Sequence, residues 1–187
     1  EWMLARVFAV RAPTSGEQWG HYRPLGALSV PSNRPFQSFP PSIQRSDLVP
    51  VIQQYVAALR RRATLRISAG TVEEDREIGS LLAAGFDSLL LGLFRWAVER
   101  VNGGKGAEGL SLAAVGSYGR CALAYHSDLD VRVMTNDHGA AAALADELFY
   151  PLWDAGVTIG HQVVTVDEVL EMAEQDLATA TSLLDWR

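Results

Sequence analysis

Two carboxylates placed two residues apart in an apolar stretch are the most chemically suggestive feature of the sequence. They are Asp128 and Asp130, within AAVGSYGRCALAYHSDLDVRVMT (residues 113–135). Side chains alternate across a strand, so both carboxylates would face one side while Leu129 and Val131 face the core. Two like charges this close repel each other unless a cation lies between them. The pair therefore favours Mg²⁺ or Mn²⁺, bound through one or two carboxylates together with substrate phosphates.

A glycine-serine pair ends the apolar stretch that precedes the two carboxylates. Gly116 would let the backbone approach a ligand closely, and Ser117 offers a hydroxyl and an N–H group to a phosphate oxygen. We expect a hairpin-like geometry to bring this turn beside Asp128 and Asp130. The glycine-rich segment NGGKGAEG (102–109) is not a P-loop, because it lacks the Gly-Lys-Ser/Thr ending and follows a helical pattern.

The spacing of these residues resembles a known signature. Gly-Ser, ten residues, then Asp-Leu-Asp-Val is similar to the motif of the DNA polymerase β-like nucleotidyltransferase superfamily. A longer resemblance is carried by four blocks in order, VGSYGR…SDLDV, LWDAG, GHQVVT and DLATATSLLDWR. Over roughly residues 75–187 these blocks look like the N-terminal catalytic domain of the PII uridylyltransferase family and its relatives.

This resemblance implies roles for six residues. In the superfamily the turn holds a nucleoside triphosphate and the two aspartates hold divalent metal. The residues that match are Gly116 and Ser117 for nucleotide binding, Asp128 and Asp130 as catalytic metal ligands, and Arg120 and Ser127 as further phosphate contacts.

The chain also departs from the family pattern. Val164 stands where the family tends to have an arginine, and residues 157–166 contain no acid that could serve as a third carboxylate. Asp167 lies just beyond, but an acid there is also favoured by the positive end of the predicted helix that follows. Two functions therefore stay open. The first is a metal-dependent nucleotidyltransferase that moves an NMP group from an NTP to a protein or small-molecule hydroxyl, as a uridylyltransferase-like domain of a larger protein. The second is a catalytically silent nucleotide-binding or protein-binding regulatory module.

Composition limits the partners and the compartment. The 187 residues carry 48% hydrophobic residues and a formal net charge of −6, which is typical of a globular chain and makes nucleic acid an unfavoured partner. Cys121 is the single cysteine, so no intrachain disulfide can form, which fits a reducing compartment. No apolar run approaches the length of a membrane span, about 18 residues or more. We therefore expect a cytoplasmic protein without membrane contact, with an NTP substrate and a protein acceptor or regulatory partner.

The hydrophobic period changes along the chain. After Gly109 it shortens from 3.6 to 2 residues, which predicts strands, with a helix over residues 138–150 before the last of them. Thr165 and Glu168 have the spacing of a capping box that would begin the final helix. The predicted strands of one sheet are residues 110–116, 128–135 and 157–166.

These patterns predict three parts in an α/β (α+β) chain. Residues 1–45 hold six of the eight prolines and are predicted to be a proline-rich arm or linker. Residues 46–103 have helical periodicity and form a helical extension. By resemblance, residues 104–187 form a polymerase β-like nucleotidyltransferase core with a small mixed sheet flanked by helices.

Overall fold

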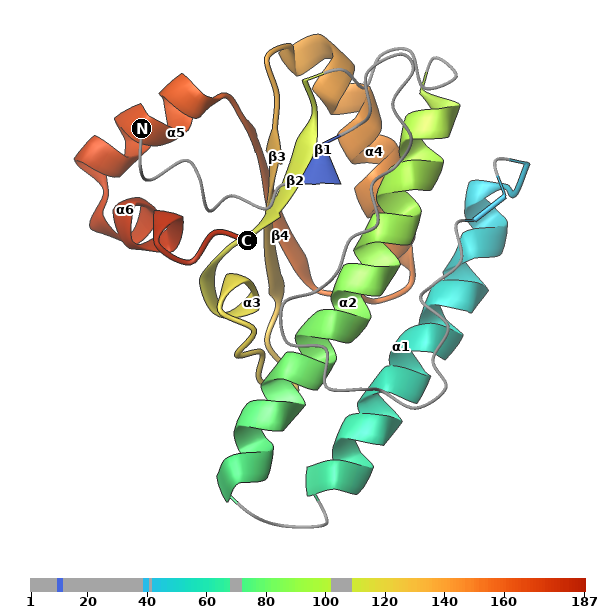
Figure 1. The fold of residues 1–187 in the computed structure, drawn as a ribbon. Helices are drawn as coiled ribbons and strands as arrows, with labels where there is room; N and C mark the ends of the chain where they lie inside the picture. The colour runs from blue at the N-terminus through green and yellow to red at the C-terminus, as the bar shows by residue number, and fades with distance from the viewer. Residues whose placement is uncertain (1–9, 12–38, 41, 68–71, 102–108) are drawn as a thin grey trace.

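A computed structural model gives the fold of most of the chain (Figure 1). The predicted arm over residues 1–45 lies almost wholly outside the described residues, and the division into three parts stays a prediction. The residues that the structure describes are 10–11, 39–40, 42–67, 72–101 and 109–187.

The described chain contains six helices and four strands. In chain order they are β1 (Val10–Arg11), α1 (Arg45–Ile67), α2 (Val72–Arg100), β2 (Ser111–Ala114), α3 (Gly116–Gly119), β3 (Leu129–Met134), α4 (His138–Asp154), β4 (Ile159–Val164), α5 (Val166–Gln175) and α6 (Leu177–Leu183).

The strands form one mixed sheet in the order β1-β2-β3-β4. β2 is antiparallel to both β1 and β3, whereas β3 and β4 are parallel and are connected through α4, as a parallel pair requires. The predicted α/β class, with a small mixed sheet flanked by helices, is confirmed. The predicted first strand is too long at its end, because Gly116 lies in the helical turn α3 and not in β2.

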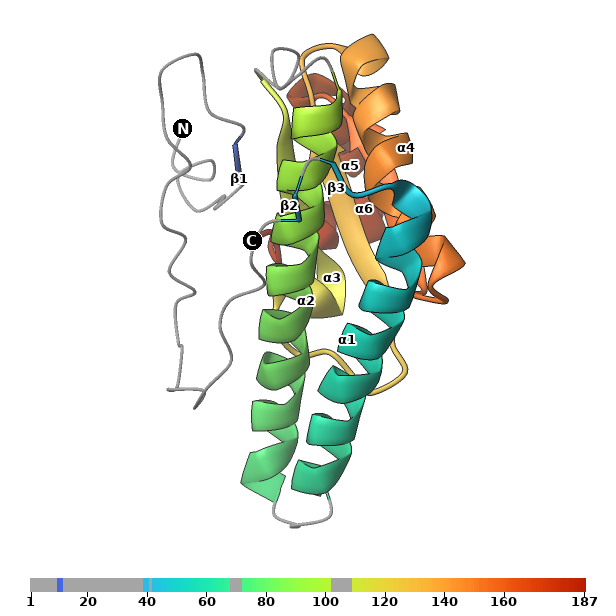
Figure 2. The same cartoon turned by 90° about the vertical axis from the view of Figure 1, so that its right-hand side faces the viewer.

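One face of the sheet and the helices α1, α2 and α4 enclose the main core. Leu129, Val131 and Val133 of β3 point into this core, as the alternation predicts. Figures 1 and 2 show α1 and α2 lying side by side as a long antiparallel pair. Tyr55 of α1 donates a hydrogen bond to the carbonyl of Gly85 in α2 at 2.8 Å, which helps to hold the pair in register.

Helix α2 corrects one expectation from the sequence. Its residues Glu77–Arg100 are long and apolar enough to cross a membrane, although the sequence was expected to contain no such run. However, 61% of its apolar stretch is buried inside the fold, where α2 contacts α1 and α4. A central core helix needs apolar residues around most of its circumference, which explains the composition.

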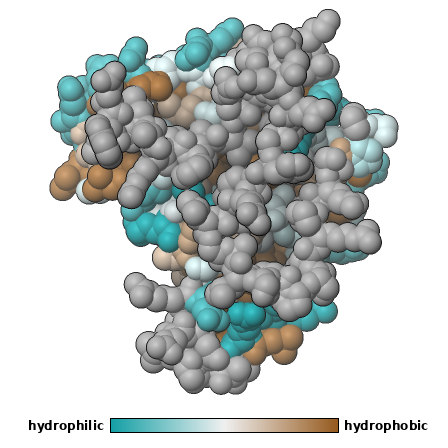
Figure 3. All heavy atoms as spheres, in the orientation of Figure 1, coloured by the Kyte–Doolittle hydropathy of each residue, from teal (hydrophilic) through white to brown (hydrophobic). Residues whose placement is uncertain are grey.

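The other face of the sheet carries α5, α6 and a second, smaller cluster. Its buried residues are Met134, Val164 and Val169, against which Met172, Leu183 and Trp186 pack. Figure 3 shows apolar side chains also on the surface over this part of the molecule.

The start of α5 confirms the predicted capping box. Thr165 accepts a hydrogen bond from the backbone of Glu168 at 3.2 Å, and Glu168 accepts one from the backbone of Thr165 at 2.8 Å.

Candidate functional site

The Gly116 turn lies directly beside Asp130. The backbone N–H of Val115 donates a hydrogen bond to the carbonyl of Asp130 at 3.0 Å. Gly116 has a φ of +61°, a conformation that side chains disfavour, and a Cβ atom there would lie 3.2 Å from Oδ2 of Asp130. The structure thus brings together the turn and one carboxylate of the pair, in the hairpin-like arrangement expected between β2 and β3.

A second glycine borders the same carboxylate from the opposite strand. Gly160 of β4 pairs with Asp130 in the parallel register, and a Cβ atom at residue 160 would lie 3.2 Å from Oδ1 of Asp130. The carboxylate therefore lies between two α-carbons that carry no side chain. Gly116 and Gly160 leave the space that the carboxylate occupies.

The two aspartates differ in environment but act on each other. Asp128 precedes β3 by one residue and is exposed, whereas Asp130 is half-buried. Burial raises the pKa of Asp130, the negative charge of Asp128 raises it further, and the positive charge of Arg132 lowers it. A cation bound by both carboxylates would relieve this repulsion.

The donor set fits one divalent ion that arrives with phosphates. Mg²⁺ is commonly bound by one or two carboxylates and substrate oxygens, and Asp128 and Asp130 supply those carboxylates. Among the described residues, no group of three or more histidine, cysteine or acidic side chains could hold a metal. The residues described therefore fit a nucleotide-borne ion better than a metal site built from protein ligands alone.

Asp167 does not supply the third carboxylate. It follows β4, which runs parallel to β3, so it lies beyond the end of the sheet opposite to Asp128. The part of β4 from Gly160, the register partner of Asp130, to Val164 is already about 13 Å long. Asp167 lies in the first turn of α5, where a negative charge stabilises the helix.

Each of the other residues predicted to contact phosphate has a partner within the protein. Ser117 is half-buried in the turn, and its carbonyl accepts a hydrogen bond from the backbone of Ala122 at 2.9 Å. Ser127 donates its hydroxyl hydrogen to the carbonyl of Ala124 at 3.0 Å, so it stabilises its own loop. The side chain of Arg120 forms an ion pair with Asp185.

The C-terminal residues hold the turn in place. Ala114 at the end of β2 and Arg187 exchange two backbone hydrogen bonds, of 2.8 and 3.0 Å. The guanidinium of Arg187 forms a bidentate pair with Asp87 of α2 at 2.5 and 2.9 Å and lies over the ring of Tyr118. Tyr118 donates its own hydroxyl hydrogen to Asp87 at 2.8 Å. The turn that carries Gly116 is thereby fixed to both α2 and the chain end.

Arg132 is the residue near the site that reasoning from the sequence missed. It lies on β3 two residues after Asp130, and its side chain is almost completely buried. A second charged residue in the strand segment LDVRVM, two positions after Asp130, was the available signal. Val164, where the family pattern has an arginine, instead packs in the second apolar cluster.

The chain is similar to proteins named bifunctional uridylyltransferase/uridylyl-removing enzyme. The protein of Streptomyces coelicolor is 44% identical over 108 residues, which make up 57% of this chain and 12% of that protein. The protein of Novosphingobium aromaticivorans is 34% identical over 136 residues, or 70% of this chain and 14% of that protein. The protein of Mycobacterium tuberculosis is 38% identical over 96 residues, or 49% of this chain and 12% of that protein.

These matches support a relation to that family. The chain spans only 12% to 14% of the length of these curated relatives. No family model matches the chain. No solved structure matches it either, so a place in the DNA polymerase β-like superfamily stays a prediction.

Proposed function

We propose that the chain is a nucleotidyltransferase domain that transfers an NMP group from an NTP to a hydroxyl of a protein or small molecule. UTP is the first candidate donor, because the relatives are named uridylyltransferases. In the reaction a bond forms between the acceptor oxygen and the α-phosphorus. The bond between the α-phosphorus and the oxygen that bridges it to the β-phosphate breaks. Pyrophosphate leaves, and the proton of the acceptor hydroxyl passes to solvent water. A cytoplasmic location would supply both nucleotide and acceptor.

The observation that carries this proposal is the position of Asp130 between Gly116 and Gly160. The absence of side chains on both glycines leaves room for this carboxylate beside the turn, where the phosphates would lie. Gly116 and Ser117 would contact the phosphates through the backbone and the serine hydroxyl.

Asp128 and Asp130 are the residues that would hold Mg²⁺ or Mn²⁺. When bound, the ion would stabilise negative charge that develops on the α-phosphate. The two carboxylates would orient the triphosphate relative to the turn. Arg120 and Ser127 remain further phosphate candidates, although both already have partners within the protein.

Binding and label transfer together test the proposal. The thermal midpoint would be measured with each of the four NTPs, with and without Mg²⁺, and we expect the largest increase with UTP and Mg²⁺. UTP labelled at the α-phosphate would then be incubated with candidate acceptor proteins, and Mg²⁺-dependent transfer of label is expected. No stabilisation by any NTP in the presence of Mg²⁺ would contradict the proposal.

One observation favours a second candidate, a catalytically silent module that binds nucleotide or a protein partner. The described residues place no third acid beside Asp128 and Asp130, and Asp167 lies beyond the opposite end of the sheet. Two carboxylates can hold the ion that travels with the triphosphate and still leave the acceptor hydroxyl without an activating group. Mg²⁺-dependent nucleotide binding without label transfer to any acceptor would support the silent module.

A further inference from the structure

Arg132 is a charged side chain that the fold buries without an ionic partner. It is 7% exposed, and it lies two residues beyond Asp130 on the same face of β3. Its Nη2 atom donates a hydrogen bond to Oγ of Ser182 at 3.4 Å, whereas Nε and Nη1 have no hydrogen-bond partner among the described residues. Burial lowers the pKa of Arg132, and the charge of Asp130 opposes this shift. An unpaired guanidinium in the interior carries a large desolvation penalty.

The unsatisfied groups around Arg132 are all donors. Trp186 packs beside Met134, the next residue on this face of β3, and its buried indole N–H also has no partner in the described chain. On this face, the buried side-chain atoms left without a partner in the described residues are therefore N–H groups and include no acceptor. Such an arrangement suits a ligand that brings acceptor oxygens.

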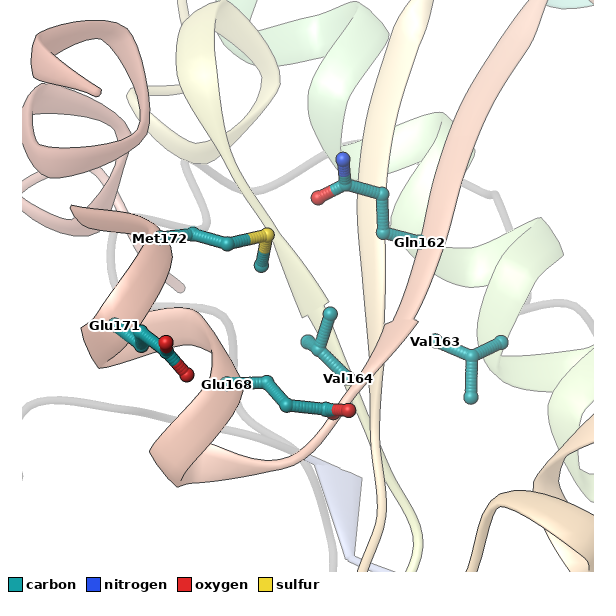
Figure 4. Close-up of a pocket in the computed structure, with 6 residues that line it drawn as sticks. All are labelled: Gln162, Val163, Val164, Glu168, Glu171 and Met172. Atoms are coloured by element: carbon teal, nitrogen blue, oxygen red, sulfur yellow. The ribbon is translucent and has the colours of Figure 1, made fainter. Parts of the chain in front are cut away.

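The neighbouring hollow limits where an anion could lie. Gln162, the register partner of Arg132 on β4, lines a hollow of about 430 Å³ together with Val164 and Met172 (Figure 4). The carboxylates of Glu168 and Glu171 line the same hollow and would repel an anion. An anion is therefore disfavoured near α5 and favoured at Arg132, where a cation held by Asp128 and Asp130 would offset the repulsion from those two carboxylates.

We propose that Arg132 is an anion-binding residue of the nucleotide site and that its Nε and Nη1 atoms bind phosphate oxygens of the NTP. The Nε–H and Nη1–H groups point to different sides of the planar guanidinium, so each would bind a separate phosphate oxygen. Arg132 and Asp130 are about 7 Å apart along the strand, which is within the reach of a triphosphate that also contacts the aspartates. Ser182 accepts a hydrogen bond from Nη2 alone, which leaves Nε and Nη1 for phosphate oxygens. This assignment rests on the proposed function.

The test measures binding of inorganic tripolyphosphate by calorimetry with and without Mg²⁺, and then binding of UTP and UMP with Mg²⁺. Arg132→Met keeps much of the length of the side chain but removes the charge. Arg132→Lys keeps the charge but removes the planar guanidinium and its N–H donors. Arg66→Met is the matched control, because Arg66 forms an exposed ion pair with Glu77 away from the site. We expect Arg132→Met to weaken tripolyphosphate and UTP binding by about 10- to 100-fold, with little effect on UMP. Arg132→Lys should retain part of the affinity, and the control should retain all of it.

Thermal unfolding separates this role from a structural one. Removing an unpaired buried charge should leave the midpoint of the unliganded protein unchanged or higher. A lower midpoint of Arg132→Met together with unchanged tripolyphosphate binding would overturn the assignment.

The outcomes also separate this assignment from the proposed function. Tight UTP binding by both the parent and Arg132→Met would refute the role of Arg132 and leave the nucleotidyltransferase proposal standing. Tripolyphosphate binding that depends on Arg132, without binding of any NTP in the presence of Mg²⁺, would support the anion site and refute the proposed function. If the parent binds neither probe, both are refuted.

Discussion

The carboxylate of Asp130 lies against the α-carbon of Gly160 on the neighbouring parallel strand. A Cβ atom at residue 160 would be 3.2 Å from Oδ1, which is closer than most contacts of a Cβ atom. The two residues are 30 positions apart in the chain, and the parallel register of β3 and β4 brings them together. The small residue on β4 is therefore part of the candidate site.

Gly160→Ala should weaken Mg²⁺-dependent UTP binding by about tenfold, because the added methyl group displaces the carboxylate by a few tenths of an ångström. The fold should remain intact, and the free energy of unfolding should stay equal or rise by about 0.5 kcal/mol through lower entropy of the unfolded chain. Calorimetry with UTP and thermal unfolding measure the two effects. UTP binding equal to that of the parent would show that the carboxylate does not need this space.

Gly116→Ala should reduce both stability and nucleotide binding. Its φ of +61° costs an alanine about 1 kcal/mol, and the new methyl group would also meet Asp130. Gly156→Ala is the matched control, since its φ is +78° and nothing lies within 4 Å of its Cβ position. Both variants should lose similar stability in denaturant titrations. Only Gly116→Ala should lose Mg²⁺-dependent UTP binding, and equal losses of binding would argue against a role of the turn.

Asp128→Asn combined with Asp130→Asn should abolish Mg²⁺-dependent nucleotide binding and leave the fold intact. Asparagine preserves the shape but removes the negative charge that holds a hard cation. The stability of the metal-free protein should rise slightly, because the repulsion between the two carboxylates disappears. Asp154→Asn, at the exposed end of α4, controls for the loss of surface charge. If the double variant binds UTP with Mg²⁺ as the parent does, the site lies elsewhere.

Glu168→Gln should make the stability of the protein depend less on pH in the acid range. The backbone hydrogen bond from Thr165 holds the pKa of Glu168 below its usual 4.5, and His138 lowers it further. A lowered pKa means that the charged form stabilises the fold above the usual pKa, and that this contribution is lost as the pH falls through the folded value. Thermal midpoints between pH 7 and pH 3 should therefore fall less steeply for Glu168→Gln than for the parent. Parallel curves would show that the cap contributes no pH dependence.

Arg187→Met should destabilise the protein by about 2–4 kcal/mol, because it leaves Asp87 without its ionic partner in a mostly buried position. A double-mutant cycle with Asp87→Asn should give a coupling energy of about 1 kcal/mol or more. Arg66→Met breaks an exposed pair with Glu77 and should cost less than about 1 kcal/mol. A coupling energy near zero, measured by denaturant titration, would contradict the role of the chain end in holding Tyr118 and the turn.

The local parts of the structure could be read from the sequence. Alternation of apolar residues predicts β3, and the spacing of Thr165 and Glu168 predicts the start of α5. The pair Asp128 and Asp130 was recognisable as a cation site candidate because period-two geometry places both side chains on one face. These features depend on residues within a few positions of one another, so the types and spacing of nearby residues predict them.

The tertiary structure alone decided which distant residues complete the site. The register of β3 and β4 places Gly160 beside Asp130, and the parallel direction of β4 places Asp167 beyond the far end of the sheet. The same holds for Arg132, because α6 brings Ser182 to its Nη2 atom, whereas Nε and Nη1 have no hydrogen-bond partner in the part of the chain that the structure describes. Contacts between segments 30 or more residues apart depend on the packing of the whole core, and the local spacing of residues does not predict them.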